Sequence, residues 1–229
     1  MTKRNKSCES EVMLTMQRKE LLKKSAIRHA EYYGMVEVQD ALYADSANKK
    51  IFTDLISIIG SDANIKMAYR NLKSNKGSNT PGVDGKTFKD LAEMSEEALV
   101  RCVRDKILNY QPKAVRRVYI PKPNGKMRPL GIPTVIDRIV QQSVLQVMEP
   151  ICEAKFYRHS YGFRPNRSTK NAVAVCYKLA QVDGFHYVVD VDIKGFFDNV
   201  DHGKLLKQIW TLGIRDKRLI SLIGKMLKA

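Results

Sequence analysis

The sequence predicts an α+β fold that is rich in helices. Segments with helical apolar spacing come first, a basic β-hairpin follows, more helices come next, and a short acidic strand lies near the end. This order differs from the regular strand–helix alternation of a doubly wound sheet. With 229 residues, 44% of them hydrophobic, the chain is long enough to bury a substantial core in one large or two small domains.

The first half of the chain is predicted to be mainly helical. Apolar spacing indicates helices at about residues 11–29, 51–59, 62–72 and 95–108. Asp62 is placed to cap the third of these, and Ser95 precedes two acidic residues that favour the first turn of the fourth. Between them, residues 73–86 contain three glycines and one proline and therefore predict a loop. The first helix is basic, which indicates a solvated face or an RNA contact.

A β-hairpin is predicted at residues 115–132. Two short strands flank Pro123-Asn124-Gly125, which is a strong turn signal, and basic residues occur along both strands. Further helices are expected at about residues 133–148, 149–156 after Pro150, 169–181, 202–212 and 215–228, with a loop at 156–168.

The most informative segment is Tyr187–Val200, YVVDVDIKGFFDNV. Its β-branched run predicts a strand, and alternation would place Asp190 and Asp192 on the same side. A carboxylate at the end of a strand is well placed to hold a metal ion. An acidic, solvated strand face explains the same residues, so the segment alone leaves both interpretations open.

The charge balance favours a polyanionic partner. Lys and Arg total 40 against 24 Asp and Glu, which gives a formal net charge of +16. Nucleic acid is the leading candidate, although ribosomal, membrane-surface and other basic proteins share this property. The four cysteines are scattered without metal-binding spacing, and we expect reduced thiols. No apolar run has membrane-spanning length and no signal-peptide pattern is present, so we expect a cytoplasmic protein with no membrane partner.

Four segments taken together closely resemble one known family. They are NKGSNTPGVDGK (75–86), VYIPKPNGKMRPLGIP (118–133), YGFRPNRST (161–169) and VVDVDIKGFFDNV (188–200). In this order they resemble the reverse transcriptases, or intron maturases, encoded by group II introns, with the likeness running from about Ala63 to the end of the chain. The resemblance implies a right-hand polymerase. Residues 1–60 would be a basic helical extension, 61–185 the fingers, and 186–229 the first part of a palm with a truncated antiparallel sheet.

The resemblance also implies roles for residues that handle the incoming nucleotide. Asp192 matches the first metal-binding, catalytic aspartate of the palm, and the backbone carbonyl of Ile193 would be a further ligand of Mg²⁺. Phe197 matches the aromatic steric gate against a 2′-hydroxyl, although core packing is the ordinary role of such a residue. Lys122 and Arg128 match the fingers residues that grip the triphosphate of the dNTP.

Further residues are expected at the nucleic acid, which the resemblance identifies as an RNA template, a DNA primer and the group II intron RNA. The predicted contacts are Thr80, Gly82, Asp84 and Gly85 in the TPGVDG loop, Arg116 and Arg117 on the hairpin, and Arg164, Asn166 and Arg167 in the GFRPNRS loop. The glycines of the first loop would let backbone approach a strand closely. A demanding turn and solvated surface charge explain the same residues without a ligand.

One departure from the family pattern limits the expected activity. Family members carry a second palm motif, aromatic-x-Asp-Asp, and no such motif follows Asp192. We therefore expect a fragment that does not polymerise by itself, because one aspartate cannot assemble a two-metal site. Two alternatives stay open: a non-catalytic RNA-binding module, and a reverse transcriptase of a retron or defence system, which the TPGVDG loop disfavours.

Overall fold

A computed structural model describes residues 28–121, 123 and 125–229. Most of the predicted basic helix at 11–29 lies outside the described residues. Lys122, the predicted triphosphate ligand, also lies outside them. The elements follow in this order: α2 (Met35–Ala47), α3 (Ile56–Ile59), α4 (Asp62–Lys73), η1 (Lys76–Asn79), α5 (Phe88–Leu91), α6 (Glu96–Leu108), β1 (Arg116–Pro121), β2 (Met127–Ile132), α7 (Val135–Glu153), α8 (Thr169–Gln181), η2 (Phe197–Asn199), α9 (His202–Thr211) and α10 (Lys217–Met226).

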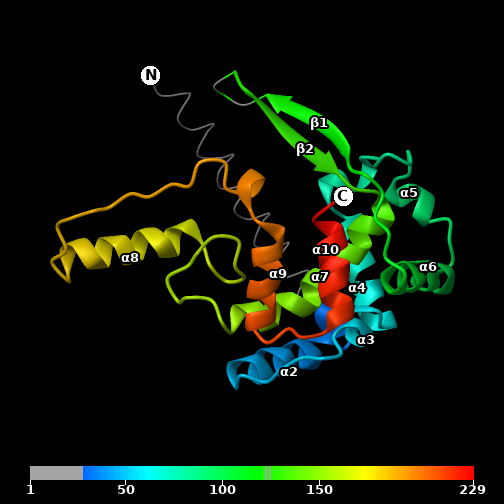
Figure 1. Cartoon of the computed structure of the whole chain (residues 1–229), viewed down its shortest axis with the longest axis horizontal. Helices are drawn as coiled ribbons and strands as arrows, with labels where there is room; N and C mark the ends of the chain where they lie inside the picture. Colours follow the sequence, from blue (N-terminus) through cyan, green and yellow to red (C-terminus); the bar gives the residue numbers. More distant parts are fainter. Residues whose placement is uncertain (1–27, 122, 124) are drawn as a thin grey trace.

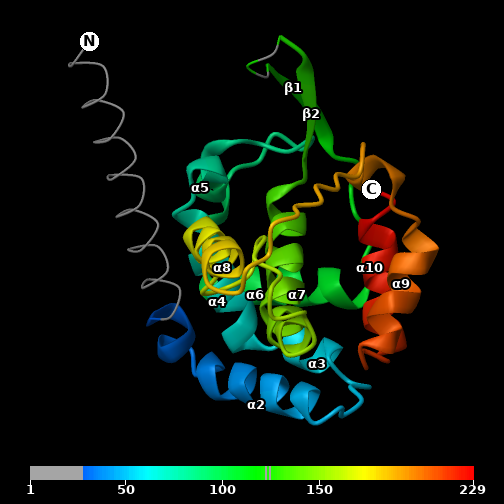
Figure 2. The same ribbon diagram turned by 90° about the vertical axis from the view of Figure 1, so that its left-hand side faces the viewer.

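Helix α7 is the centre of the fold, and α2, α3, α4 and α6 pack against it (Figures 1 and 2). It buries one apolar face completely, including Ile139, Val147 and Ile151. The sequence predicts helix on both sides of Pro150, and α7 runs through that residue to Glu153. A proline cannot bond the carbonyl four residues before it. Here the carbonyl oxygen of Gln146 accepts a hydrogen bond from Gln39 Nε2 at 3.2 Å instead, so the helix continues without an unsatisfied group.

A buried polar network joins α4 to α7. Asn64 Nδ2 donates to the carbonyl oxygen of Ser143 at 3.0 Å, and Gln146 Nε2 donates to Asn64 Oδ1 at 2.8 Å. Asn71 Nδ2 donates in turn to Gln146 Oε1 at 2.9 Å. Buried amides that are satisfied in this way fix the register of one helix against the other.

The C-terminal pair α9 and α10 joins the bundle through a short bridge and a shared cap. Phe52 pairs with Ile214 in an isolated parallel bridge. Asp216, which is 1% exposed, accepts hydrogen bonds at Oδ2 from the backbone N–H groups of Leu55 and Ile56 at 2.9 and 3.0 Å. Its Oδ1 caps α10. One carboxylate therefore serves the start of two helices that are far apart in sequence.

The predicted hairpin is confirmed and projects from the helical body (Figure 1). Its strands are antiparallel, with Arg116 opposite Ile132 and Pro121 opposite Met127. Gly125 in the turn has φ +78°, a conformation that favours glycine. The residues of the outer part of the hairpin are exposed, so neighbours other than the paired strand give it little support.

Three predictions about elements are wrong. Ser61, rather than Asp62, caps α4, because its hydroxyl accepts from the N–H of Asn64. The helix expected at 51–59 is only the four residues of α3. The acidic strand does not form: residues 185–193 are irregular, and among the described residues β1 and β2 make up the whole sheet.

The missing strand has a physical reason. A strand is stabilised by a neighbour that shares its backbone hydrogen bonds. No described segment pairs with residues 187–193, and Val188 and Val189 are 94% and 85% exposed. Helix α8, which precedes the segment, has no buried residue, and Figure 1 shows both lying to one side of the bundle. The expected palm sheet is therefore absent from the described part of the chain.

None of the described helices has both the length and the apolar character that spanning a membrane requires.

Candidate nucleic-acid interface

The TPGVDG loop lies at the N-terminal end of α7, against the base of the hairpin. Gly82 is buried, and a Cβ atom there would lie 2.7 Å from Thr134 Cα and 2.9 Å from the carbonyl oxygen of Pro133. No side chain fits in this space, so glycine is required for close packing rather than for an unusual backbone angle. The tip of the loop turns outward: Val83 and Gly85 are exposed, and Gly85 has φ +71°.

Two guanidinium groups hold this loop by its backbone. Arg138 on α7 donates to the carbonyl oxygens of Gly77 at 2.9 Å and Thr80 at 2.6 Å. Arg116 on β1 donates from Nε to the carbonyl oxygen of Pro81 at 3.0 Å. The hairpin and α7 therefore bind adjacent residues of one loop. The sequence did not indicate this role for Arg138, because its acceptors are backbone groups with no side-chain signature.

The hairpin presents basic side chains outward. Arg117 and Arg128 are exposed, on β1 and β2 respectively. Arg116 is half-buried and donates to the carbonyl oxygen of Pro81, so its side chain bonds within the protein. The contacts of Arg117 and Arg128 with phosphate remain predictions.

The GFRPNRS loop is held at the other end of α7. Arg164 is 8% exposed, and its guanidinium pairs with Glu153, the last residue of α7. Arg164 was predicted to contact nucleic acid, but here its side chain holds the loop to α7. Its guanidinium group is buried in this conformation. Asn166 is exposed in a left-handed conformation at φ 55°, and Arg167 donates to the carbonyl oxygen of Arg158 at 2.8 Å.

The predicted nucleic-acid residues thus form two groups rather than one. The TPGVDG loop and hairpin lie together at the start of α7, and the GFRPNRS loop lies at its end. Helix α7 is 19 residues long, so its first and last residues are about 27 Å apart at a rise of 1.5 Å per residue. The two groups therefore lie at opposite ends of α7 in the arrangement that the structure describes.

The segment with the predicted metal ligand is open. Asp192 and the carbonyl of Ile193 lie in irregular chain, and Phe197 is 83% exposed in the short η2 helix. No group of three or more His, Cys, Asp or Glu residues that could hold a metal occurs in the part of the chain that the structure describes. Mg²⁺ takes one or two carboxylates together with water and phosphate oxygens. Asp192 supplies one such carboxylate, but a two-metal centre needs more, so these residues alone do not fit it.

A buried charged cluster beneath the hairpin was not anticipated. Asp137 Oδ2 accepts from Thr134 Oγ1 at 2.6 Å and from the backbone N–H of Lys113 at 3.3 Å. Lys106 Nζ lies 3.8 Å from Asp137 Oδ1. Burial, and then the neighbouring Asp137 carboxylate, raise the pKa of the Tyr110 hydroxyl. These groups join α6, the segment that leads into β1, and α7.

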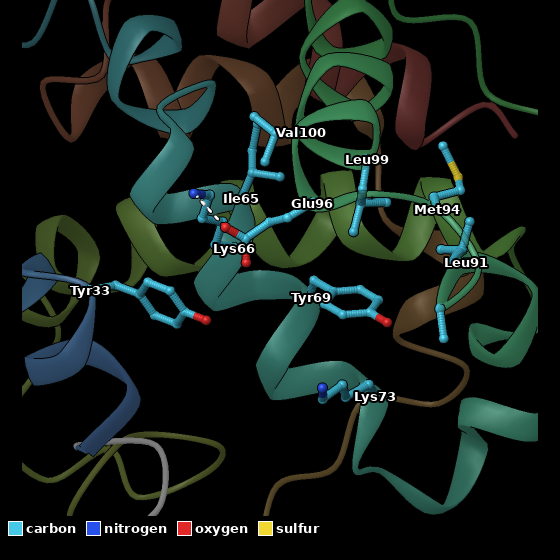
Figure 3. A pocket seen from close by; sticks show the side chains of 11 residues that line it. Tyr33, Ile65, Lys66, Tyr69, Lys73, Leu91, Met94, Glu96, Leu99 and Val100 are labelled. Atoms are coloured by element: carbon cyan, nitrogen blue, oxygen red, sulfur yellow. Dashed lines mark ion pairs between the residues drawn. The ribbon is translucent and has the colours of Figure 1, made fainter.

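A cavity of 260 Å³ opens between α4 and the start of α6 (Figure 3). Tyr33, Tyr69 and Lys73 line it, and Lys66 Nζ is paired with Glu96 Oε1 at 2.6 Å on its wall. None of the residues predicted to bind a ligand lines this cavity.

Comparisons with known proteins agree with the resemblance. Residues 120–228 match the family described as reverse transcriptase (RNA-dependent DNA polymerase). The chain is 44% identical over 168 residues to protein YkfC of Escherichia coli, covering 71% of this chain and 43% of that protein. It is 42% identical over 164 residues to the group II intron-encoded protein LtrA of Lactococcus lactis, covering 71% and 26%. It is also 31% identical over 196 residues to a putative COX1/OXI3 intron 1 protein of Saccharomyces cerevisiae, covering 83% and 22%.

The match to residues 120–228 places the second half of the hairpin, α7 and all later elements in a reverse transcriptase domain. Within that class, the chain belongs to the group II intron-encoded reverse transcriptases and maturases, as its similarity to intron-encoded proteins extends well beyond the shared domain. The chain spans less than half the length of these curated relatives.

Proposed function

We propose that this chain is the fingers, with the beginning of the palm, of an RNA-directed DNA polymerase encoded by a group II intron, and that it binds intron RNA and an RNA template. The observation that carries the proposal is the contact between the TPGVDG loop and the hairpin. Two segments that resemble nucleic-acid-binding blocks of the family meet at the start of α7, and they do so in a chain of net charge +16.

The chemistry of this surface suits a backbone contact. Arg117 and Arg128 present exposed guanidinium groups, which can bind phosphate oxygens through two N–H groups at once. The loop presents backbone at Val83–Gly85 without bulky side chains beyond Val83. Phosphate contacts of this kind position a strand without reading its sequence. Arg128, with Lys122, is proposed to hold the triphosphate of the dNTP when a primer and template are present.

The metal-dependent step is proposed for the full-length enzyme. In that proposal Asp192 and the carbonyl of Ile193 contribute to a Mg²⁺ site, and Phe197 contacts the sugar of the incoming nucleotide. Bound Mg²⁺ would supply charge neutralisation at the triphosphate. The residues of this chain would bind and orient the template, the primer and the nucleotide.

The test is RNA binding measured by fluorescence anisotropy between 50 and 300 mM KCl, on this chain and with labelled single-stranded RNA. Neutralising several phosphates releases counterions, so log affinity should fall linearly with log salt, with a slope of about −0.7 per phosphate contact for a single strand. Arg117→Ala and Arg128→Ala should each weaken binding and reduce the slope by roughly one contact.

Arg101→Ala is the matched control, because Arg101 is an exposed arginine on α6, outside the predicted blocks. An affinity that does not change with salt, or one that falls equally in all three variants, would contradict the proposal.

A non-catalytic RNA-binding module is the second candidate. The exposed, unpaired segment around Asp192 favours it, because a catalytic carboxylate is normally fixed by the elements around it. Both functions predict RNA binding, and they differ in whether the chain extends a primer.

A further inference from the structure

Arg138 is bonded more fully than an ordinary surface arginine. Its Nε donates to the carbonyl oxygen of Pro133 at 3.0 Å, while its two terminal nitrogens donate to Gly77 at 2.9 Å and Thr80 at 2.6 Å. The guanidinium therefore bonds both the chain that enters α7 and two positions of the preceding loop. Because the group is planar and rigid, three bonds in fixed directions define where the loop lies.

All of these acceptors are backbone carbonyls. Arg138 therefore holds the loop by its backbone, and the exposed side chains of the loop are left for other contacts. The packing of Gly82 on Thr134 leaves no room for a methyl group and so limits the same loop from its inner side. At the tip, Asp84 Oδ1 accepts from the backbone N–H of Lys86 at 3.3 Å, which closes the turn around exposed Gly85.

The hairpin also binds this loop, through Arg116 on β1. Arg116 Nε donates to Pro81, the residue directly after Thr80. Two arginines from different elements thus converge on neighbouring carbonyls. Burial lowers the pKa of Arg138, and the charge of Arg116 acts in the same direction, while the Asp84 carboxylate opposes this change. The acidic residue of the loop therefore offsets the charge that accumulates where the two arginines meet.

We propose that Arg138 is a positioning residue which, with Arg116, locks residues 77–85 onto the base of the hairpin, so that the loop tip and the hairpin meet the nucleic acid as one rigid surface. This inference rests on the proposed RNA-binding function. It assigns to Arg116 an internal role in place of a direct template contact. It also gives a functional role to Arg138, which was not among the residues predicted to contact nucleic acid.

Two measurements on the full chain separate the lock from RNA binding. The first is limited trypsin digestion, which reports on the loop directly, because Lys76 and Lys86 are exposed at its two sides. The second places a photo-reactive benzophenone amino acid at Val83, which is 48% exposed, and measures crosslinking to labelled single-stranded RNA. The variants are Arg138→Ala, Arg138→Lys and Gly82→Ala, with Arg101→Ala as the control of equal charge.

The lock predicts that Arg138→Ala raises cleavage at Lys86 at least tenfold and lowers crosslinking from position 83 at least fivefold, while total RNA affinity changes less than threefold. Arg138→Lys should recover cleavage resistance only in part, because an ammonium group cannot make three bonds in fixed directions. Gly82→Ala should reproduce both effects with no change of charge. Arg101→Ala should behave as the unmodified chain.

Unchanged cleavage and crosslinking in Arg138→Ala would overturn the inference. So would a loss of RNA affinity without any change in cleavage, since Arg138 would then contact RNA itself. If the unmodified chain does not bind RNA, the proposed function fails, and with it the claim that the loop and hairpin form a binding surface. The digestion of Gly82→Ala and Arg138→Ala would still decide whether the loop is locked.

Discussion

The guanidinium of Arg164 and the carboxylate of Glu153 form a two-point ion pair at the end of α7. Nε lies 2.8 Å from Oε2 and Nη2 lies 2.6 Å from Oε1. The remaining nitrogen, Nη1, donates to the carbonyl oxygens of Tyr157 at 2.6 Å and Ser160 at 3.0 Å. The hydrogen bonds to Glu153 raise the pKa of Arg164 above its usual range. One side chain thus ties residues 157–164 to the last turn of the central helix.

Replacing Arg164 should therefore release this loop. We expect Arg164→Ala to lower the thermal midpoint by about 5 °C, because the variant leaves Glu153 and two carbonyl groups without their donor. Arg164→Lys should recover only part of the loss, since lysine cannot form the two-point pair. Differential scanning calorimetry measures the change.

Arg167→Ala is the control for Arg164, because Arg167 is a neighbouring arginine with one hydrogen bond, to the carbonyl oxygen of Arg158. Equal midpoints for Arg164→Ala and Arg167→Ala would contradict the structural role of Arg164.

Asp216 should be among the most sensitive positions for stability. Its carboxylate accepts from four backbone N–H groups at the starts of α3 and α10. Loss of one helix cap costs about 1 kcal/mol, and buried donors left unsatisfied add to this. Asp216→Ala should therefore lower the free energy of unfolding by about 3 kcal/mol in urea titration.

Asp201→Ala offers a comparison for Asp216, since Asp201 caps the exposed start of α9 alone. We expect a clearly smaller loss for that variant. A loss as large as that of Asp216→Ala would show that the double cap adds nothing.

The helices were predictable because their signals are local. Ser95, Thr134, Ser168 and Asp201 each cap the helix that the sequence predicts at that place. Apolar spacing then indicates the buried face. The hairpin was predictable for the same reason, since Pro123-Asn124-Gly125 is a local turn signal between two short segments that can form strands. The donor that satisfies the Gln146 carbonyl four residues before Pro150 could not be predicted, because it is Gln39, 111 residues before Pro150 and therefore outside any local window.

The acidic strand and the site could be predicted only in part. The sequence pattern at 187–193 is that of a strand, yet strand formation depends on a partner that a local pattern cannot supply. The family blocks indicated which loops matter, and the structure brings two of them together at the start of α7. How they are held could not be read from the sequence, because Arg138 and Arg116 bond to backbone carbonyls. Arg164 illustrates the converse: an arginine in a basic loop is buried against a glutamate.

Cys152 should be the least reactive of the three cysteines in the described part of the chain. Burial, and then the Glu149 carboxylate, raise the pKa of its thiol to about 11. Only the thiolate reacts, and with that pKa about 0.1% of the Cys152 side chain is ionised to thiolate at pH 8. Cys102 and Cys176 are exposed. In a Cys8→Ser background, a disulfide reagent at pH 8 should therefore modify two thiols rapidly and Cys152 at least tenfold more slowly.

The rate at which the reagent modifies Cys152 should increase with pH. Because the thiolate fraction of Cys152 grows as pH approaches 11, its rate should rise about tenfold per pH unit between pH 8 and 10. Peptide mapping by mass spectrometry identifies the modified residue. Equal rates for all three thiols in the folded protein would contradict the burial of Cys152, and unfolding in urea should abolish the difference.

The last prediction concerns catalysis by this chain. Asp192 lies in an exposed, unpaired segment, and no aromatic-x-Asp-Asp motif follows it in the sequence. Two-metal phosphoryl transfer requires several carboxylates fixed around the reacting oxygens. We therefore expect primer extension on an RNA template with Mg²⁺ and labelled dNTP to give no more product than Asp192→Asn does, while both chains bind the same RNA equally. Mg²⁺-dependent product that disappears in Asp192→Asn would show instead that these 229 residues assemble a working site, and it would exclude the purely RNA-binding alternative.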